Sequence, residues 1–105
     1  NLLGVQGTLS MVNGATLSVT TNTGANIVHI YETGSGSGAI YFVNYAGATS
    51  IIAQNGSETF GIAASGAGAD LNLYKNTNSH PVTFQNYSGE TKTIQINVIG
   101  CANTR

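Results

Sequence analysis

The chain has 105 residues, and only 7% of them are charged, against about 25% in a typical soluble domain. The formal net charge is -1, there is no basic cluster, and no apolar run approaches the roughly 18 residues of a membrane span. These features exclude nucleic acid binding and membrane insertion as expected functions, and the length predicts one domain over residues 1–105.

The start of the chain and its cysteine content limit the classes of protein to which it could belong. Asn1 is not preceded by Met, and no signal-peptide pattern follows it, so we expect the C-terminal fragment of a longer protein, either a processed product or an excised domain. Cys101 is the only cysteine, so no internal disulfide can form. We expect an inert thiol there, with cross-linking between copies as the alternative.

Apolar residues alternate with polar ones along segments rich in Thr, Val, Ile and Tyr, which is typical of strands. The segments expected to be strands are residues 7–12, 15–21, 25–33, 38–45, 49–54, 58–64, 69–75, 80–87 and 91–99. Turn residues separate them, as at Asn13-Gly14, Asn55-Gly56 and Ser88-Gly89. Strands this short and this regularly spaced predict an all-β fold, a jelly-roll-like antiparallel β-sandwich of about eight to nine strands.

The first two expected strands carry a short repeat that constrains their pairing. Residues 8–12 read Thr-Leu-Ser-Met-Val, and residues 16–20 read Thr-Leu-Ser-Val-Thr. A strict two-residue hairpin at Asn13-Gly14 would place the two apolar sets on opposite faces of one sheet. We therefore predict either a bulged turn through Ala15 or strands that pair elsewhere.

Two expected strands, residues 25–33 and 38–45, are apolar on both sides. In a small domain one face of a strand normally meets the single core, so a second apolar face predicts an interface with another copy of the chain. A ligand-binding surface is the alternative. The residues predicted to form this interface are Ile27, His29, Tyr31, Tyr41, Val43 and Tyr45.

No set of residues in the chain favours catalysis. Its carboxylates are each expected at strand ends or in turns, exposed to water; they are Glu32, Glu58, Asp70 and Glu90. His29 lies inside an expected strand, and His80 precedes Pro81, which favours an extended strand entry rather than a catalytic base. No His or Cys stands at metal-ligand spacing. We therefore expect no enzymatic activity, no catalytic residues, no metal site and no cofactor.

Binding of a sugar is better supported than catalysis. Proteins bind sugars with aromatic rings against the apolar face of the sugar and with amides or hydroxyls against its hydroxyl groups. Tyr74 lies among such residues, and the predicted ligand-binding set is Tyr74, Asn72, Asn76 and Lys75. A plain polar loop is the alternative, and the absence of Trp argues against a dedicated carbohydrate-binding module.

The second half of the chain resembles a known family. Residues 69–75, Ala-Asp-Leu-Asn-Leu-Tyr-Lys, and the alternating stretch from His80 to Gly100 resemble the C-terminal β-rich domains of bacteriophage tail fibre and tail spike proteins. Residues 40–45 and 49–54 resemble the two strands that commonly precede them in such domains. The resemblance extends from Gly38 to Gly100, about two thirds of the chain.

The resemblance implies a homotrimer in the tail of the virion that attaches to a bacterial surface and recognises a surface glycan or receptor. It identifies no binding residues in this chain. The leading hypothesis is therefore a non-enzymatic distal domain of a phage tail fibre or spike. The alternatives are a monomeric lectin-like carbohydrate-binding module of a secreted protein, and a bacterial adhesin or pilin-like structural module that exchanges strands between copies.

Overall fold

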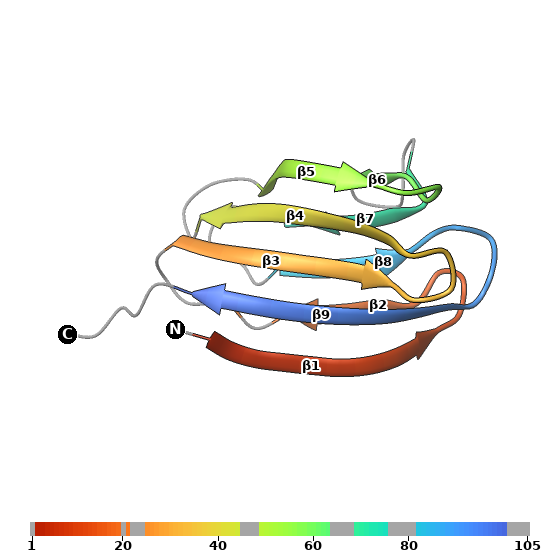
Figure 1. Cartoon of the computed structure of the whole chain (residues 1–105), viewed down its shortest axis with the longest axis horizontal. Helices are drawn as coiled ribbons and strands as arrows, with labels where there is room; N and C mark the ends of the chain where they lie inside the picture. The colour runs from red at the N-terminus through yellow and green to blue at the C-terminus, as the bar shows by residue number, and fades with distance from the viewer. Residues whose placement is uncertain are drawn as a thin grey trace.

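The protein is an all-β sandwich, which confirms the predicted fold class (Figure 1). The computed structural model describes residues 2–19, 21, 25–44, 49–63, 69–75 and 82–100, with only the backbone of residues 2–7. Within these ranges it has nine strands and no helix, and hence no helix able to cross a membrane. Each observed strand lies inside a predicted range or extends one residue beyond it, except that the first strand begins earlier, at Leu2.

The strands form two sheets whose order differs from the order in the chain. The larger sheet has the order β1-β9-β3-β4-β5. Its strands are β1 (Leu2–Met11), β9 (Lys92–Gly100), β3 (Ala25–Glu32), β4 (Ser37–Asn44) and β5 (Thr49–Asn55). The smaller sheet has the order β2-β8-β7-β6, and its strands are β2 (Thr16–Val19), β8 (Val82–Asn86), β7 (Leu71–Tyr74) and β6 (Phe60–Gly61). All neighbouring pairs are antiparallel except β6 with β7.

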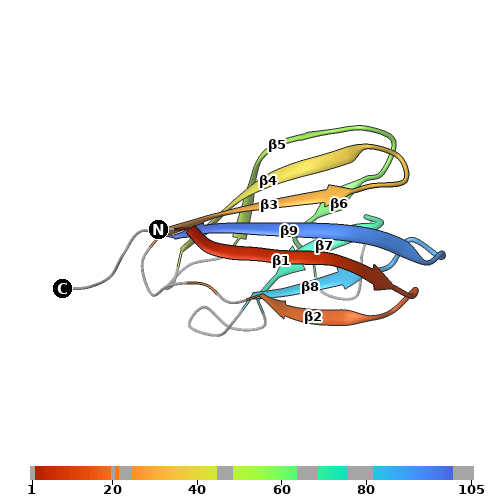
Figure 2. The ribbon, with the colours of Figure 1, turned by 60° about the horizontal axis from the view of Figure 1, so that its bottom comes forward.

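The turn after β1 carries the chain from one sheet to the other (Figure 2). β1 pairs with β9 and β2 pairs with β8, so the two copies of the repeat never pair with each other. Met11 and Val19 can then both point into the core. Of the two predicted alternatives, a bulged turn or pairing elsewhere, the fold has the second. This pairing of the first two strands with the last two is jelly-roll-like, whereas β3, β4 and β5 form a simple meander.

The core lies between the two sheets and is made by alternate residues of each strand. Its largest fully buried side chains are Tyr41, Phe84, Ile30, Leu71, Leu73, Ile94 and Ile96. Two hydrogen bonds join the sheets where β4 and β5 face β6 and β7: the Tyr41 hydroxyl donates to the Gly61 carbonyl (2.8 Å), and Thr49 Oγ1 donates to the Leu73 carbonyl (2.9 Å). Burial raises the pKa of the Tyr41 phenol, so it stays protonated as a donor.

The predicted interface is wrong for two of its residues, because β4 turns the opposite face outward. Tyr41 pairs with Val28 and shares the inner face with it, and Tyr41 and Val43 are 0% and 1% exposed. The outward side chains of β4 are Ile40 and Phe42 instead. Tyr45 lies outside the described residues.

The other half of the predicted interface does lie on the outer face of the larger sheet. Ile27, His29 and Tyr31 alternate with the buried residues of β3 and are half-buried. Their role in contacts between copies stays a prediction.

The predicted ligand-binding set is wrong for Tyr74 and Asn72, which are 8% and 0% exposed. All four residues of β7 are buried, so the strand has no exposed face. Asn72 Nδ2 donates to the Ala69 carbonyl (3.2 Å), and the Asn72 amide lies so close to Gly61 that a side chain at Gly61 would collide with it. Lys75 Nζ donates to the Asn44 carbonyl, and Asn76 lies outside the described residues.

One fully buried asparagine joins two turns at the end of the sandwich where β1 and β8 finish. Asn86 Nδ2 donates to the carbonyls of Met11 (2.7 Å) and Glu90 (2.8 Å). Its Oδ1 accepts from Ser88 N (3.1 Å) and Ser88 Oγ (2.7 Å), and its backbone pairs with Gly14 and Ala15. The amide thus holds together the β1–β2 and β8–β9 connections.

Candidate functional site

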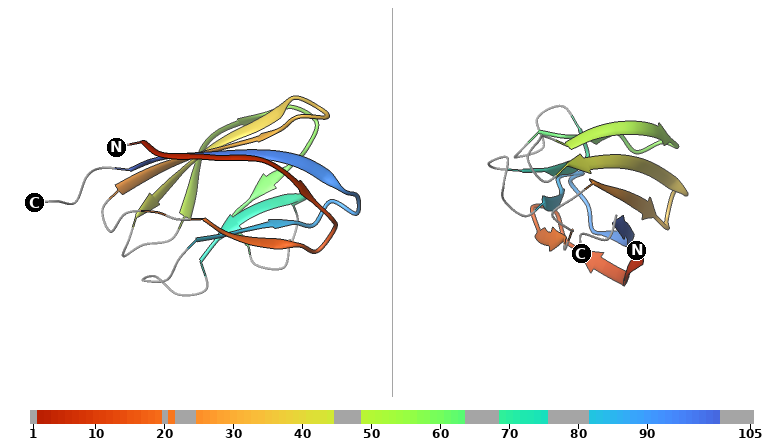
Figure 3. Two further views of the ribbon diagram at one scale, coloured as in Figure 1. Left: turned by 90° about the horizontal axis from the view of Figure 1, so that it is seen from below. Right: turned by 90° about the vertical axis from the view of Figure 1, so that its left-hand side faces the viewer.

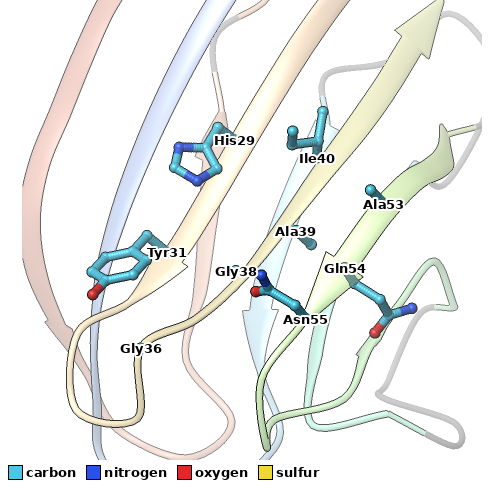
Figure 4. A pocket seen from close by; sticks show the side chains of 9 residues that line it. All are labelled: His29, Tyr31, Gly36, Gly38, Ala39, Ile40, Ala53, Gln54 and Asn55. Atoms are coloured by element: carbon cyan, nitrogen blue, oxygen red, sulfur yellow. The ribbon is translucent and has the colours of Figure 1, made fainter.

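The outer face of the larger sheet has a hollow of about 380 Å³ over the end of β3, β4 and β5 (Figure 4). This volume is near the lower end of the roughly 300–1,000 Å³ found for small-molecule sites. The residues that line it are His29, Tyr31, Gly36, Gly38, Ala39, Ile40, Ala53, Gln54 and Asn55.

The hollow arises from the register of the three strands. Gly38 lies between Tyr31 on β3 and Asn55 on β5, because it pairs with both of them. Gly38 has no side chain, so the space above it stays open between a ring and an amide. A Cβ at Gly38 would lie 3.4 Å from the Ile30 carbonyl oxygen and 3.7 Å from His29 Nε2, which is ordinary contact. The backbone around Gly38 thus leaves room for a Cβ, which would project into the hollow.

Two rings form one wall of the hollow. The centroids of His29 and Tyr31 are 6.5 Å apart, with ring planes tilted by 36°. Asn97 Nδ2, from β9, lies 3.4 Å from His29 Nδ1. An amide N–H can only donate, so Nδ1 accepts, and a neutral imidazole then carries its proton on Nε2. Since Nε2 lies beside Gly38, His29 presents an N–H donor to the hollow.

The opposite wall is polar. Asn55 lies beside Gly38 in Figure 4, and its side chain is exposed. The amide of Gln54, the neighbouring residue, has a structural role, because its Oε1 accepts from Phe60 N (3.2 Å). Asn55 is therefore the amide of this wall that is best placed to reach a ligand.

The hairpin beside the hollow is organised around Glu32, which is only 3% exposed. Its carboxylate accepts from Gly34 N (2.9 Å), Ser35 N (2.8 Å) and Ser35 Oγ (2.5 Å). Ser37 Oγ lies 2.7 Å from Ser35 Oγ and accepts from Glu58 N (3.0 Å), which ties the hairpin to the segment after β5. The expectation that Glu32 is exposed to water is wrong, because the turn wraps its backbone N–H groups around the carboxylate.

The same contacts set the charge state of Glu32. Burial raises the pKa of its carboxyl, but the hydrogen bonds from Ser35 and Gly34 more than offset burial and hold the pKa below the ordinary 4.5. A carboxyl whose pKa is lowered by folding stabilises the folded state above its unfolded pKa, and this contribution is lost as the pH falls through the folded pKa.

We therefore expect part of the free energy of unfolding to be lost as the pH falls below about 4.5, and Glu32→Gln to reduce this dependence. Urea unfolding at neutral pH and in acid measures it. Glu90→Gln is the control, because the Glu90 side chain is 73% exposed and should leave the pH dependence unchanged. An acid dependence that is identical in Glu32→Gln and the wild type would contradict this role.

The hollow is uncharged. None of the residues that line it is Asp, Glu, Lys or Arg. Elsewhere in the described ranges, no three His, Cys, Asp or Glu side chains are grouped so that they could hold a metal ion. What the hollow offers is an aromatic surface, an imidazole N–H and a side-chain amide, which together suit an uncharged ligand with many hydroxyl groups.

Only some of the residues that line the hollow could be singled out from the sequence. It singled out His29 and Tyr31, but for an interface, and treated Asn55 as a turn residue. The signal that joins them is the strand register, which puts Gly38 between Tyr31 and Asn55. Comparison of the chain with protein-family models, curated proteins and solved structures gives no match.

Proposed function

We propose that the chain is a non-enzymatic distal domain of a phage tail fibre or spike, which recognises a neutral glycan of the bacterial surface at the hollow over Gly38. The observation that carries the proposal is the pairing of two rings with an exposed amide across an uncharged glycine floor. The resemblance of residues 38–100 to tail fibre and tail spike domains supports the attachment role.

The two walls of the hollow would make different contacts with a sugar. The ring of Tyr31 packs against the apolar C–H face of the sugar. His29 Nε2–H donates to one hydroxyl oxygen, while the Asn55 amide both donates and accepts. The rings stand on a strand inside a five-stranded sheet, so little side-chain freedom is lost on binding.

We propose further that the domain acts as a homotrimer in the virion tail. A single shallow hollow gives a weak contact, because a small sugar buries little surface in it. Three copies that engage one surface convert later contacts into intramolecular ones, which raises the overall avidity by orders of magnitude. Attachment to a repeating surface glycan benefits directly from this effect.

The test is the binding of bacterial surface glycans and neutral oligosaccharides on an array. Tyr31→Ala is expected to weaken binding by about tenfold or more, since it removes the aromatic wall. Tyr87→Ala is the matched control, because Tyr87 is 51% exposed and does not line the hollow. Equal binding by both variants, or no binding by the wild type to any glycan, would refute the proposal.

A second variant separates the loss of the site from the loss of the fold. Gly38→Val fills the floor of the hollow, and the position has ordinary contact distances for a Cβ. Its unfolding should stay close to that of the wild type, while glycan binding is lost. Binding that survives Gly38→Val would place the ligand elsewhere on the molecule.

A further inference from the structure

The two side edges of the sandwich differ in shape. One edge is formed by β5 and β6, the last strands of the two sheets, and the other by β1 and β2. Figures 1 and 3 show β1 and β5 at opposite sides of the larger sheet. The β5/β6 edge is closed by the bond from Phe60 N to Gln54 and by the bond from Tyr41 to Gly61.

The β1/β2 edge contains an open apolar groove of about 280 Å³. It is lined by Leu9, Ser10, Met11, Val12, Ala15, Thr16 and Leu17. Val12 is 61% exposed although it is apolar, and no residue of the lining is charged. An exposed apolar groove beside two strands at sheet edges is a site that another protein segment can fill.

The opposite edge presents apolar side chains that would fill such a groove. Ile52 is 57% exposed and Ile62 is 47% exposed. Ile52 projects because of a bulge in β5: Ile51 pairs with Tyr41 and Ala53 pairs with Ile40, which leaves Ile52 between them without a partner on β4. The bulge leaves this isoleucine exposed at the edge, and its burial against another apolar surface would be favourable.

We infer that the two edges bind each other between copies of the chain, with Ile52 and Ile62 of one copy in the groove between β1 and β2 of the next. This contact would form the interface of the homotrimer. The number of copies, three, rests on the proposed function. It is heterologous, since each copy uses a different surface on each side.

The dimensions of the two edges set the area of the contact. The shorter edge is that of β5, whose seven residues span about 23 Å, and two stacked sheets with their side chains are about 20 Å thick. One contact between the edges therefore offers on the order of 460 Å² from each copy, below the roughly 800 Å² of a standard interface, but each copy of a closed trimer makes two such contacts. Neither Ile52, Ile62 nor the groove lining is charged, so no like charges oppose the contact.

This arrangement also fits the hollow better than the interface predicted from the sequence. An interface through His29 and Tyr31 would cover the hollow that they line. The edge contact through Ile52 uses the side of β5 and does not cover the His29 and Tyr31 wall of the hollow, which stands on β3. Binding of a second copy is therefore favoured at the edges of the sandwich, and binding of a glycan is favoured at the hollow.

Native mass by light scattering tests the inference on the full chain. Ile52→Asp and Val12→Asp change exposed residues and should each reduce a trimer, near three times 10.7 kDa, to smaller species without unfolding it. Ile99→Asp is the matched control, because Ile99 is 52% exposed on the outer face of the larger sheet. Its mass should equal that of the wild type.

Mixing the two edge variants gives a sharper result. Ile52→Asp keeps an intact groove and Val12→Asp keeps intact isoleucines, so the mixture should form a one-to-one pair near twice 10.7 kDa that neither variant forms alone. Absence of this pair would overturn the inference.

The other outcomes separate the inference from the proposed function. A wild-type trimer that persists in both edge variants would overturn the edge contact and leave the proposed trimer standing. A wild-type monomer would overturn both, while glycan binding lost in Tyr31→Ala would still support recognition at the hollow. Long polymers broken by either variant would support the edge contact and contradict a closed trimer.

Discussion

Replacing Gly56 by alanine is expected to lower the free energy of unfolding by about 3–5 kcal/mol, through backbone strain together with overpacking. Gly56 has φ of +101°, a conformation that side chains other than glycine rarely adopt. A Cβ there would lie 2.5 Å from Ser37 Cα and 2.6 Å from Ser37 Cβ. Because Ser37 is fully buried and bonded to Glu58 N, it cannot move away.

Gly89→Ala separates the two causes. Gly89 has φ of +90°, close to that of Gly56, but no atom lies within 4 Å of the position of its Cβ. Its substitution should therefore cost only the strain, about 1 kcal/mol. Urea unfolding of both variants measures the difference, and equal losses would show that the contact with Ser37 is unimportant.

Asn86→Asp is expected to lower the free energy of unfolding by about 3–5 kcal/mol at neutral pH, the cost of an unpaired buried charge. The side chain keeps its shape, but Nδ2 is replaced by an oxygen that faces the carbonyls of Met11 and Glu90. Two donated hydrogen bonds become two repulsive contacts, inside a site with no exposure to water.

Asn55→Asp is the control for this substitution, because Asn55 lies on the surface. It makes the same chemical change where water solvates the new charge, so its stability should stay within about 0.5 kcal/mol of the wild type. Thermal or urea unfolding measures both variants. A loss in Asn86→Asp no larger than in Asn55→Asp would contradict the role of Asn86 in holding the turns.

The sequence predicted the strands well because two local signals agree. Side chains alternate along each strand, and turn residues such as Asn13-Gly14 and Ser88-Gly89 separate the strands. Both signals depend on nearest neighbours in the chain, so they are visible without tertiary contacts. The repeat around Met11 was also informative, since it disfavoured a two-residue hairpin and left a bulged turn or pairing elsewhere, of which the fold has the second.

The orientation of β4 could not be predicted in this way. Tyr41 and Val43 alternate with Ile40 and Phe42, and both sets are apolar. Only the pairing with β3, which sets Tyr41 beside buried Val28, decides which set enters the core. When both alternating sets are apolar, the sequence does not show which set faces the core.

The burial of Asn72 and Tyr74 is a second feature that could not be predicted from the sequence. Their polar groups alternate with Leu71 and Leu73, which predicts an exposed face. In the fold all four residues of β7 are buried, and Asn72 Nδ2 donates to the Ala69 carbonyl, a contact that no periodicity reports. The hollow over Gly38 was missed for the same reason, because it exists only once three strands are in register.

The position of β9 between β1 and β3 has a consequence for how the protein is made. During synthesis on the ribosome, β1 emerges first, and its only partner in the sheet is β9, made some eighty residues later. Until then β1 and β3 each present an unpaired edge, which is a risk for aggregation. The larger sheet therefore closes only when Lys92–Gly100 has left the exit tunnel, and both edges stay exposed while the strands between β1 and β9 are made.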